Sequence, residues 1–362
     1  MSLSILIFGA GAIGSFIGGH MAAAGHQVTL LGRPEGMRKI SREGLTIFWP
    51  DRAAIEAFPK TVSTNEQLSP PYDFIFLTVK APDTPRALAQ LADLPLSKKA
   101  YIVSFQNGLG NEEQIATAFG PKKCMAGTVT IPIQMLEQGR LEVSKAKGGL
   151  GVAPLDASQP GHALAEALNQ AGLITEVYAD YRAMKWSKLL LNIVNNASSA
   201  ILGQPPAQII ENPALFNLEI EALGEGVQVM KAQDIPAVKL PGYSVQWLAR
   251  LVGPQWLPLL LKRTMLRPFM LSGRGSKMPS LYLDLAAGRS TSEIQALNGA
   301  IVQAGQKFGL PMPVNRTLTA ILSDLVSGQV TWSDYKDRPQ KLIQAVQEAK
   351  SSHSSFKFGS NV

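Results

Sequence analysis

Ser4-Ile-Leu-Ile-Phe-Gly-Ala-Gly-Ala-Ile-Gly14 is the stretch that decides the fold. Its first five residues form an apolar run typical of a buried strand, and residues 12–24 have the pattern of a helix. Glycines in the order Gly-x-Gly-x-x-Gly between a strand and a helix can bind a dinucleotide pyrophosphate, because they permit a tight turn and close backbone approach. The alternative is a glycine-rich turn that binds nothing. We predict a cofactor-binding turn formed by Gly9, Ala10, Gly11, Ala12, Ile13 and Gly14.

Strand-like and helix-like runs alternate through the first half of the chain. The expected strands are 4–8, 27–31, 74–79 and 101–105, and the expected helices between them are 12–24 and 84–91. This alternation predicts a parallel sheet with right-handed crossovers. Further β-runs follow at 127–131, 141–144 and 174–178, with a helix at 162–171.

After residue 180 the periodicity is helical, in the stretches 181–202, 213–233, 291–308 and 313–327. The predicted fold class is therefore α/β, with a Rossmann-type dinucleotide-binding domain followed by an all-α C-terminal domain. We place the first domain at residues 1–179, the second at 180–350 and a flexible tail at 351–362.

Composition narrows the class of protein. Of 362 residues, 46% are hydrophobic and 17% charged, so the chain can bury a core and is not intrinsically disordered. One cysteine and four histidines exclude an internal disulfide and a cysteine-rich zinc module, and we predict no metal site. No apolar stretch approaches the roughly 20 residues of a membrane span, and no secretory signal begins the chain, so we expect a cytoplasmic protein without membrane contacts.

The net charge of +7 comes from dispersed Lys and Arg side chains. A nucleic-acid-binding protein would gather them on one face, so small anionic molecules are the expected partners, and no nucleic acid. The end of the second expected strand reads Leu-Gly-Arg33, where an NAD enzyme usually has Asp or Glu. A guanidinium there can hold a ribose 2′-phosphate, so we predict NADPH/NADP⁺ as the cofactor, with Arg38 and Lys39 in assistance. A surface arginine without a ligand is the alternative.

Lys188, Asn192 and Asn196 recur every four residues in an otherwise apolar helical stretch. This spacing predicts a polar line along one side of a helix. Burying such groups without partners costs several kcal/mol, which favours a functional role. The alternative is a lysine that extends its ammonium to water, with asparagines bonded locally. A carbonyl-reducing enzyme needs a proton donor, and none of the four histidines is paired with an acid in a recognisable relay.

These features together resemble the ketopantoate reductase (2-dehydropantoate 2-reductase) family over most of the chain. Further matching motifs are Thr78-Val79-Lys80-Ala81, Gln106-Asn107-Gly108, Ser280, Asp284, Gly288-Arg289, Glu293-Ile294 and Asn298-Gly299. The resemblance implies a Rossmann domain plus a helical domain with the site in the cleft between them. It also implies NADPH-dependent reduction of a 2-keto acid, with 2-dehydropantoate converted to pantoate in pantothenate biosynthesis as the default reaction.

The resemblance also implies catalytic roles. Lys188 would be the general acid that protonates the ketone oxygen, and a desolvated lysine has a lowered pKa that favours this donation. Glu293 would complete the catalytic site. Glu293 also follows Ser290 at the spacing of a capping box, an entirely structural use of the residue.

Binding roles follow from the same resemblance. Asn192 and Asn196 would bond the substrate hydroxyl, and Asn107 and Ser280 would hold the substrate and its carboxylate. Asn107 and Lys80 would also lie near the nicotinamide end of the cofactor.

One long segment departs from the family pattern. Residues 234–279 exceed the length found in compact members and are rich in Trp and Arg. A lid, an oligomer contact such as that of a homodimer, a core filler and a surface excursion all remain open for this segment. Other functions also remain open: a β-hydroxyacid dehydrogenase-like oxidoreductase, a non-catalytic NADP(H)-sensing regulator and, less favoured, a Rossmann methyltransferase.

Overall fold

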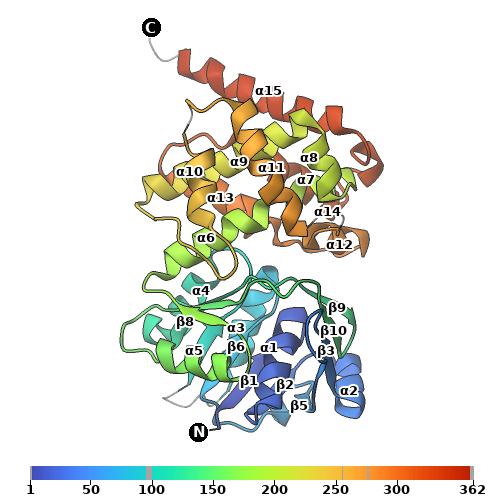
Figure 1. The fold of residues 1–362 in the computed structure, drawn as a ribbon, viewed down its shortest axis with the longest axis vertical. Helices are drawn as coiled ribbons and strands as arrows, with labels where there is room; N and C mark the ends of the chain where they lie inside the picture. Colours follow the sequence, from blue (N-terminus) through green and yellow to red (C-terminus); the bar gives the residue numbers. More distant parts are fainter. Residues whose placement is uncertain (1, 95–99, 255, 275–276, 359–362) are drawn as a thin grey trace. The chain divides into compact units, whose positions relative to one another are not determined.

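The structure is a computed structural model that describes residues 2–94, 100–254, 256–274 and 277–358 (Figure 1). Its contacts divide the chain into two units. Unit 1 comprises Met1–Lys188 and Lys239–Tyr243, and unit 2 comprises Leu189–Val238 and Ser244–Val362. The helix α6 (Tyr181–Ile193) therefore begins in unit 1 and ends in unit 2.

An eight-stranded sheet forms the centre of unit 1. Its strand order is β12-β11-β8-β7-β6-β1-β2-β5, and all neighbours are parallel except the antiparallel pair β8 and β11. The strands are β1 (Ser4–Phe8), β2 (Gln27–Leu31), β5 (Lys60–Val62), β6 (Phe74–Leu77), β7 (Tyr101–Ser104), β8 (Cys124–Val129), β11 (Leu150–Pro154) and β12 (Thr175–Val177). The predicted α/β class is confirmed.

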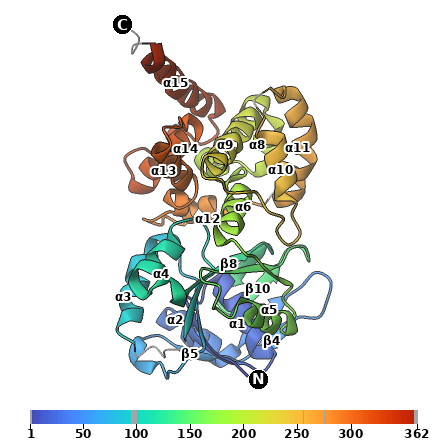
Figure 2. The ribbon, with the colours of Figure 1, turned by 90° about the vertical axis from the view of Figure 1, so that its left-hand side faces the viewer.

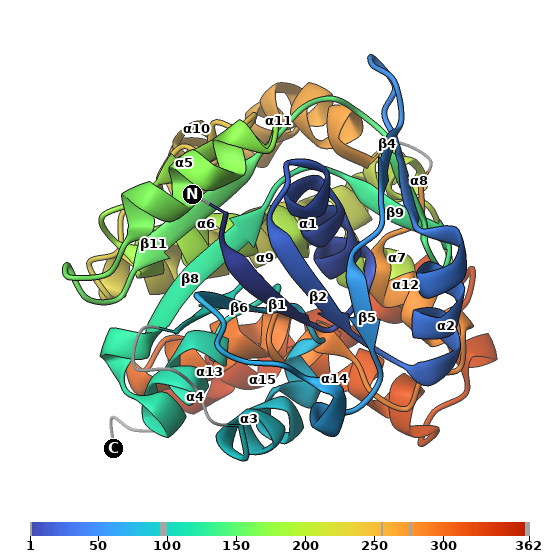
Figure 3. The same ribbon diagram turned by 90° about the horizontal axis from the view of Figure 1, so that it is seen from below.

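Side chains alternate between the two faces of this sheet. Ile5 and Ile7 of β1 pack in one core cluster with Phe16 of α1, whereas Leu6 packs on the opposite face with Leu88 of α3. Figure 3 shows α1 on one face and α3 and α4 on the other. The helices of unit 1 are α1 (Ala12–Ala23), α2 (Pro34–Glu43), α3 (Thr84–Ala92), α4 (Asn111–Phe119) and α5 (Gly161–Gln170).

A second, four-stranded sheet lies in unit 1 with strand order β4-β3-β10-β9. Its strands are β3 (Leu45–Phe48), β4 (Ile55–Ala57), β9 (Ile133–Glu137) and β10 (Arg140–Val143). Of these, the sequence predicted a strand only near β10, and it missed β3 although Leu-Thr-Ile-Phe is a largely apolar run of the kind typical of strands.

The order of strands reverses at β1, because the chain adds β2 and β5 on one side and then crosses to β6 on the other. Ligands of doubly wound sheets bind beyond the carboxyl ends of the strands at such a switch point. The glycine turn at 9–14 follows β1, and the loop 78–80 follows β6. The topology therefore brings these two motifs to the same edge of the sheet.

The described residues of unit 2 form helices and connecting loops, which confirms the all-α C-terminal domain. Helix α9 packs against α8, α10 and α14, among which it runs in Figure 2. The helices are α7 (Asn196–Leu202), α8 (Pro206–Glu211), α9 (Pro213–Ala232), α10 (Val245–Val252), α11 (Leu259–Arg274), α12 (Ser280–Ala286), α13 (Asn298–Lys307), α14 (Pro313–Ser327) and α15 (Pro339–Phe358). Within the part of the chain that the structure describes, no helix is long and apolar enough to cross a membrane.

The structure describes most of the predicted tail and most of the long segment 234–279. The tail predicted at 351–362 contributes residues 351–358 to α15, and 359–362 lie outside the described residues. The long segment 234–279 contains α10 and α11, while its residues 255, 275 and 276 are not described. Trp256 is 81% exposed, whereas Lys262 is buried and donates to the Val252 carbonyl at 3.0 Å.

Candidate active site

The glycine turn after β1 closes onto the loop after β6. Gly9 has a φ of +113°, and the Thr78 hydroxyl donates to the Gly9 carbonyl oxygen at 2.6 Å. A Cβ on Gly14 would lie 2.2 Å from that same oxygen, so packing alone requires glycine there. At Gly11, by contrast, a Cβ would meet no described atom within 4 Å. The open side of Gly11 leaves room for a phosphate to approach the backbone.

The N-terminus of α1 suits an anion. Gly11 is its N-cap residue, no described side chain caps the helix, and its first turn contains no acidic residue. The free N–H groups and the helix dipole therefore face no carboxylate of the same turn. Ala10 is buried, and Ala12 and Ile13 are half-buried. The turn at residues 9–14 fits a dinucleotide pyrophosphate.

Arg33 follows β2 and is the exposed N-cap residue of α2. The nearest acid, Glu35, lies in the first turn of α2 and is also exposed. Lys39, expected to assist with a phosphate, forms an ion pair of 2.6 Å with Glu137. Arg33 is therefore the better-placed candidate for a 2′-phosphate contact, with exposed Arg38 further along α2.

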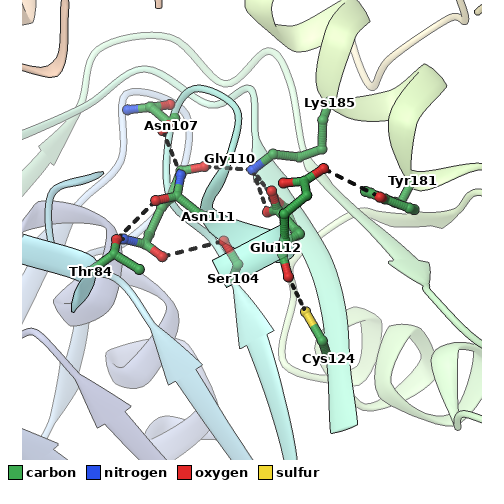
Figure 4. Close-up of polar contacts among 12 residues, drawn as sticks. Thr84, Ser104, Asn107, Gly110, Asn111, Glu112, Cys124, Tyr181 and Lys185 are labelled. Atoms are coloured by element: carbon green, nitrogen blue, oxygen red, sulfur yellow. Dashed lines mark hydrogen bonds and ion pairs between the residues drawn. The ribbon is translucent and has the colours of Figure 1, made fainter. Parts of the chain in front are cut away.

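A buried polar network connects the loops that carry Lys80 and Asn107, and Figure 4 shows its part around Thr84, Asn107 and Asn111. The Gln106 side-chain amide donates to the Val79 carbonyl at 3.0 Å and to the Thr84 hydroxyl at 2.7 Å. The Thr84 hydroxyl in turn donates to Asn111 Oδ1 at 2.9 Å. Asn111 Nδ2 donates to the Asn107 carbonyl at 3.2 Å. Each loop is therefore held by side chains from the other loop or from an adjoining helix.

Lys185 is a buried residue that the sequence reasoning missed. Its Nζ lies 2.9 Å from Glu112 Oε1, and the two side chains are 3% and 1% exposed. The same ammonium donates to the carbonyl oxygens of Gln106 at 2.7 Å and Gly127 at 3.4 Å. The only sequence signal was a lysine in an apolar helix three residues before Lys188. Nothing local identified Glu112 as its partner, because that residue belongs to a distant helix.

Cys124 lies against the same region of unit 1. Its Sγ is 3.5 Å from the Glu112 carbonyl oxygen, and burial raises the pKa of the thiol well above its usual value. A thiol that keeps its proton is a poor nucleophile, so this cysteine is a packing residue.

The helix predicted at 181–202 is wrong in one respect, because it breaks into α6 and α7. At the break, Asn195 has a φ of +54°, a left-handed conformation that asparagine tolerates better than most residues. The buried Glu219 carboxylate of α9 accepts from the Asn195 N–H at 2.6 Å and from the Ser198 hydroxyl at 2.5 Å. Asn192 and Asn196 therefore lie on two helices and do not form one continuous line.

Part of the predicted substrate site comes together within unit 2. The Asn196 amide donates to the Asn192 carbonyl at 3.1 Å and accepts from the Leu281 N–H at 3.3 Å. Leu281 follows Ser280, the exposed first residue of α12. These contacts bring Asn192, Asn196 and the start of α12 together, and both asparagines are buried. Their role toward substrate stays a prediction.

Lys188 and Glu293 belong to different units. Lys188 is half-buried and ends the first segment of unit 1, and Glu293 is buried in unit 2. The capping-box interpretation of Glu293 is wrong, because Ser292 is the N-cap residue and accepts from the Ile294 N–H at 3.2 Å. Glu293 is thus the first residue of a 3₁₀ turn and lies too early to reach back in a capping box.

Comparison with known proteins covers both units. The family model described as "Ketopantoate reductase PanE/ApbA" matches residues 5–156, and the model of the C-terminal part of the same family matches residues 180–326. The chain belongs to the ketopantoate reductase family. This confirms the resemblance seen in the sequence.

Individual ketopantoate reductase relatives align with nearly the whole length of this chain. The 2-dehydropantoate 2-reductase of Archaeoglobus fulgidus is 28% identical over 326 residues, which is 90% of this chain and 98% of the relative. The solved PanE/ApbA family ketopantoate reductase of Ralstonia eutropha JMP134 has a TM-score of 0.75 at 26% identity, covering 90% of this chain and 99% of that one. A ternary structure of D-mandelate dehydrogenase with NADH and anilino(oxo)acetate shares the fold, with a TM-score of 0.74 at 22% identity and coverage of 90% and 98%.

Proposed function

We propose that the protein catalyses the NADPH-dependent reduction of 2-dehydropantoate to pantoate. The observation that carries the proposal is the match of both units to one reductase family, together with Lys188 in its motif on α6. A relative named 2-dehydropantoate 2-reductase aligns with 90% of the chain.

The residues present suit a nicotinamide dinucleotide. The turn at 9–14 would hold the pyrophosphate, Arg33 a 2′-phosphate, and Lys80 and Asn107 the nicotinamide end. When bound, NADPH supplies the hydride that is added to the ketone carbon. Arg33 and the lack of an acid at the end of β2 favour NADPH over NADH.

The protein's own task in such a reaction is to handle charge and a proton. Negative charge develops on the ketone oxygen, and the Lys188 ammonium would neutralise that charge and donate a proton from Nζ to the oxygen. The ketone becomes a hydroxyl, and Lys188 regains a proton from solvent. We assign orientation of the substrate to Asn107, Asn192, Asn196 and Ser280, and completion of the catalytic site to Glu293.

A second candidate is reduction of an aromatic 2-keto acid with NADH. The D-mandelate dehydrogenase structure, which contains NADH and anilino(oxo)acetate, supports this alternative through its similar fold. Arg33 argues for NADPH and so against it.

An assay of cofactor oxidation with a panel of 2-keto acids tests the proposal. The panel contains ketopantoate, benzoylformate, 2-oxoisovalerate and pyruvate, each with NADPH and with NADH. We expect the highest kcat/KM for ketopantoate with NADPH. A maximum for benzoylformate with NADH would favour the second candidate, and no oxidation with any acid would reject both.

A further inference from the structure

We propose that Lys185 is a positioning residue, which with Glu112 holds the two loops of unit 1 that carry Asn107 and Lys80. The consequence for catalysis rests on the proposed function, in which these loops hold the nicotinamide end of the cofactor. The Lys185–Glu112 pair contacts backbone and buried groups of unit 1, and we assign it no contact with substrate or cofactor.

The first step is the contact with the peptide group before Asn107. The Gln106 carbonyl that accepts from Lys185 at 2.7 Å belongs to the peptide linking Gln106 to Asn107. The next carbonyl, that of Asn107, accepts from Asn111 Nδ2 at 3.2 Å. The peptide groups on both sides of Asn107 are therefore oriented by side chains. A charged donor in a dry environment makes the first of these bonds a strong one.

The second step carries the constraint to Lys80. The Gln106 side chain donates to the carbonyl of Val79, which belongs to the peptide linking Val79 to Lys80. Thr84, just after that loop, bonds to both Gln106 and Asn111. The two loops thus form one hydrogen-bonded unit, and Lys185 joins it to α6 (Figure 4). A shift of the Gln106 peptide would move both loops.

The third step is the relation to Lys188. Residues three apart on a helix lie on neighbouring parts of one face. Lys185 and Lys188 have this spacing on α6, and both belong to unit 1. The anchor at Lys185 therefore sets where α6 starts relative to the Asn107 loop, and with it the position of the predicted proton donor.

Stability alone does not explain the Lys185–Glu112 pair. Replacing a buried ion pair by apolar residues of similar volume is often neutral for folding. No apolar side chain, however, can donate to the Gln106 carbonyl. The ion pair therefore does one thing that an apolar contact cannot do, which is to orient the peptide that links Gln106 to Asn107.

The test uses the double variant Lys185→Met/Glu112→Met, which removes both charges and keeps the volume. Its matched control is Tyr181→Phe/Glu113→Gln, which removes the more exposed α6–α4 hydrogen bond of 3.3 Å. We expect the double variant to stay folded, with kcat for ketopantoate lowered about a hundredfold, since a misplacement of about 1 Å costs that much. NADPH affinity should fall about tenfold while adenosine 2′,5′-bisphosphate binds unchanged, because this fragment lacks the nicotinamide. A structural defect of the whole of unit 1 would instead weaken the binding of both NADPH and adenosine 2′,5′-bisphosphate.

Amide hydrogen exchange makes the test independent of turnover. Residues 79–84 and 106–111 should exchange faster in the double variant and not in the control, while β1 and α1 stay protected. If the double variant does not fold, Lys185→Arg, which keeps the charge but changes donor geometry, should give the same pattern.

Wild-type kcat together with unchanged exchange in these loops would overturn the proposal. If the wild-type protein reduces no 2-keto acid, the proposed function fails, and hydrogen exchange alone decides whether Lys185 holds the loops.

Discussion

Unit 1 and unit 2 bury carboxylates in different ways. In unit 1, Glu112 lies 2.9 Å from the ammonium of Lys185. In unit 2, Glu219 accepts from neutral donors at the break between α6 and α7, and Glu225 accepts from the backbone N–H groups of Val314 and Asn315 at the start of α14. The Lys185–Glu112 ion pair holds loops of the candidate site. Glu219 and Glu225, whose hydrogen-bond donors are uncharged, hold the beginnings of α7 and α14.

The difference between the two units affects how stability and activity depend on pH. Burial raises the pKa of Glu219 to about 7, although hydrogen bonds from Ser198 and Asn195 act in the opposite direction. Burial likewise raises the pKa of Glu225 to about 7, against hydrogen bonds from Asn315 and Val314. We therefore expect activity to depend on the charges of unit 1, and unit 2 to contribute a loss of stability as the pH rises from about 4.5 through about 7.

The largest expected effect separates turnover from cofactor binding in unit 1. Lys188→Ala should lower kcat about a hundredfold to ten-thousandfold, the usual contribution of general acid catalysis. NADPH binding should persist, since the pyrophosphate turn is untouched. Steady-state kinetics and fluorescence titration with NADPH measure the two quantities, and Lys307→Ala, an exposed lysine of α13, is the control. Near-normal turnover would remove the catalytic assignment.

Breaking the ion pair from one side should affect folding. Glu112→Met leaves Lys185 buried without its counter-charge, which typically costs about 3–5 kcal/mol. Urea unfolding measures the loss in free energy of unfolding. Glu113→Gln, the exposed neighbour, should change it little. Equal stabilities of the two variants would show that the pair contributes nothing to unit 1.

Glu219→Gln tests how the buried Glu219 carboxyl of unit 2 contributes to stability. A carboxyl whose pKa rises from 4.5 to about 7 on folding contributes about 3 kcal/mol below pH 4.5, and this contribution is lost as the pH rises through about 7. Glutamine can donate to Ser198 and accept from the Asn195 N–H without titrating. The variant should therefore lose less stability between pH 4.5 and about 7 than the wild type.

Thermal unfolding at a series of pH values measures this slope. Glu211→Gln, an exposed carboxylate of α8, is the matched control and should keep the wild-type slope. An unchanged slope in Glu219→Gln would mean that Glu219 does not titrate in this range.

The smallest effect concerns an exposed charge of unit 1. Loss of a charge-assisted contact to a 2′-phosphate costs about 1.5–3 kcal/mol, so Arg33→Ala should weaken NADPH binding roughly tenfold to a hundredfold and spare NADH. Calorimetric titration with both cofactors checks this, with Arg42→Ala at the end of α2 as the control. Equal affinity of the wild-type protein for both cofactors would contradict the role of Arg33.

The strongest sequence predictions were local. The strands Ser4–Phe8 and Gln27–Leu31 and the helix Pro313–Ser327 have the predicted bounds, because apolar periodicity and flanking turn residues lie within the same few residues. The glycine turn was predicted for the same reason. Close contacts with Gly9 and Thr78 require a glycine at position 14. The sequence did not reveal these contacts, but the Gly-x-Gly-x-x-Gly motif already contains this glycine.

What the sequence alone determined was the alternation of strands and helices, the glycine turn, the family and the set of candidate residues. Only the tertiary structure decided that Lys185 meets Glu112, that Glu219 stabilises a break before Asn196, and that Ser292 rather than Ser290 caps the turn at Glu293. The physical reason is range: periodicity and propensity act between near neighbours in the chain, whereas the partner of a buried charge is chosen by the packing of distant segments.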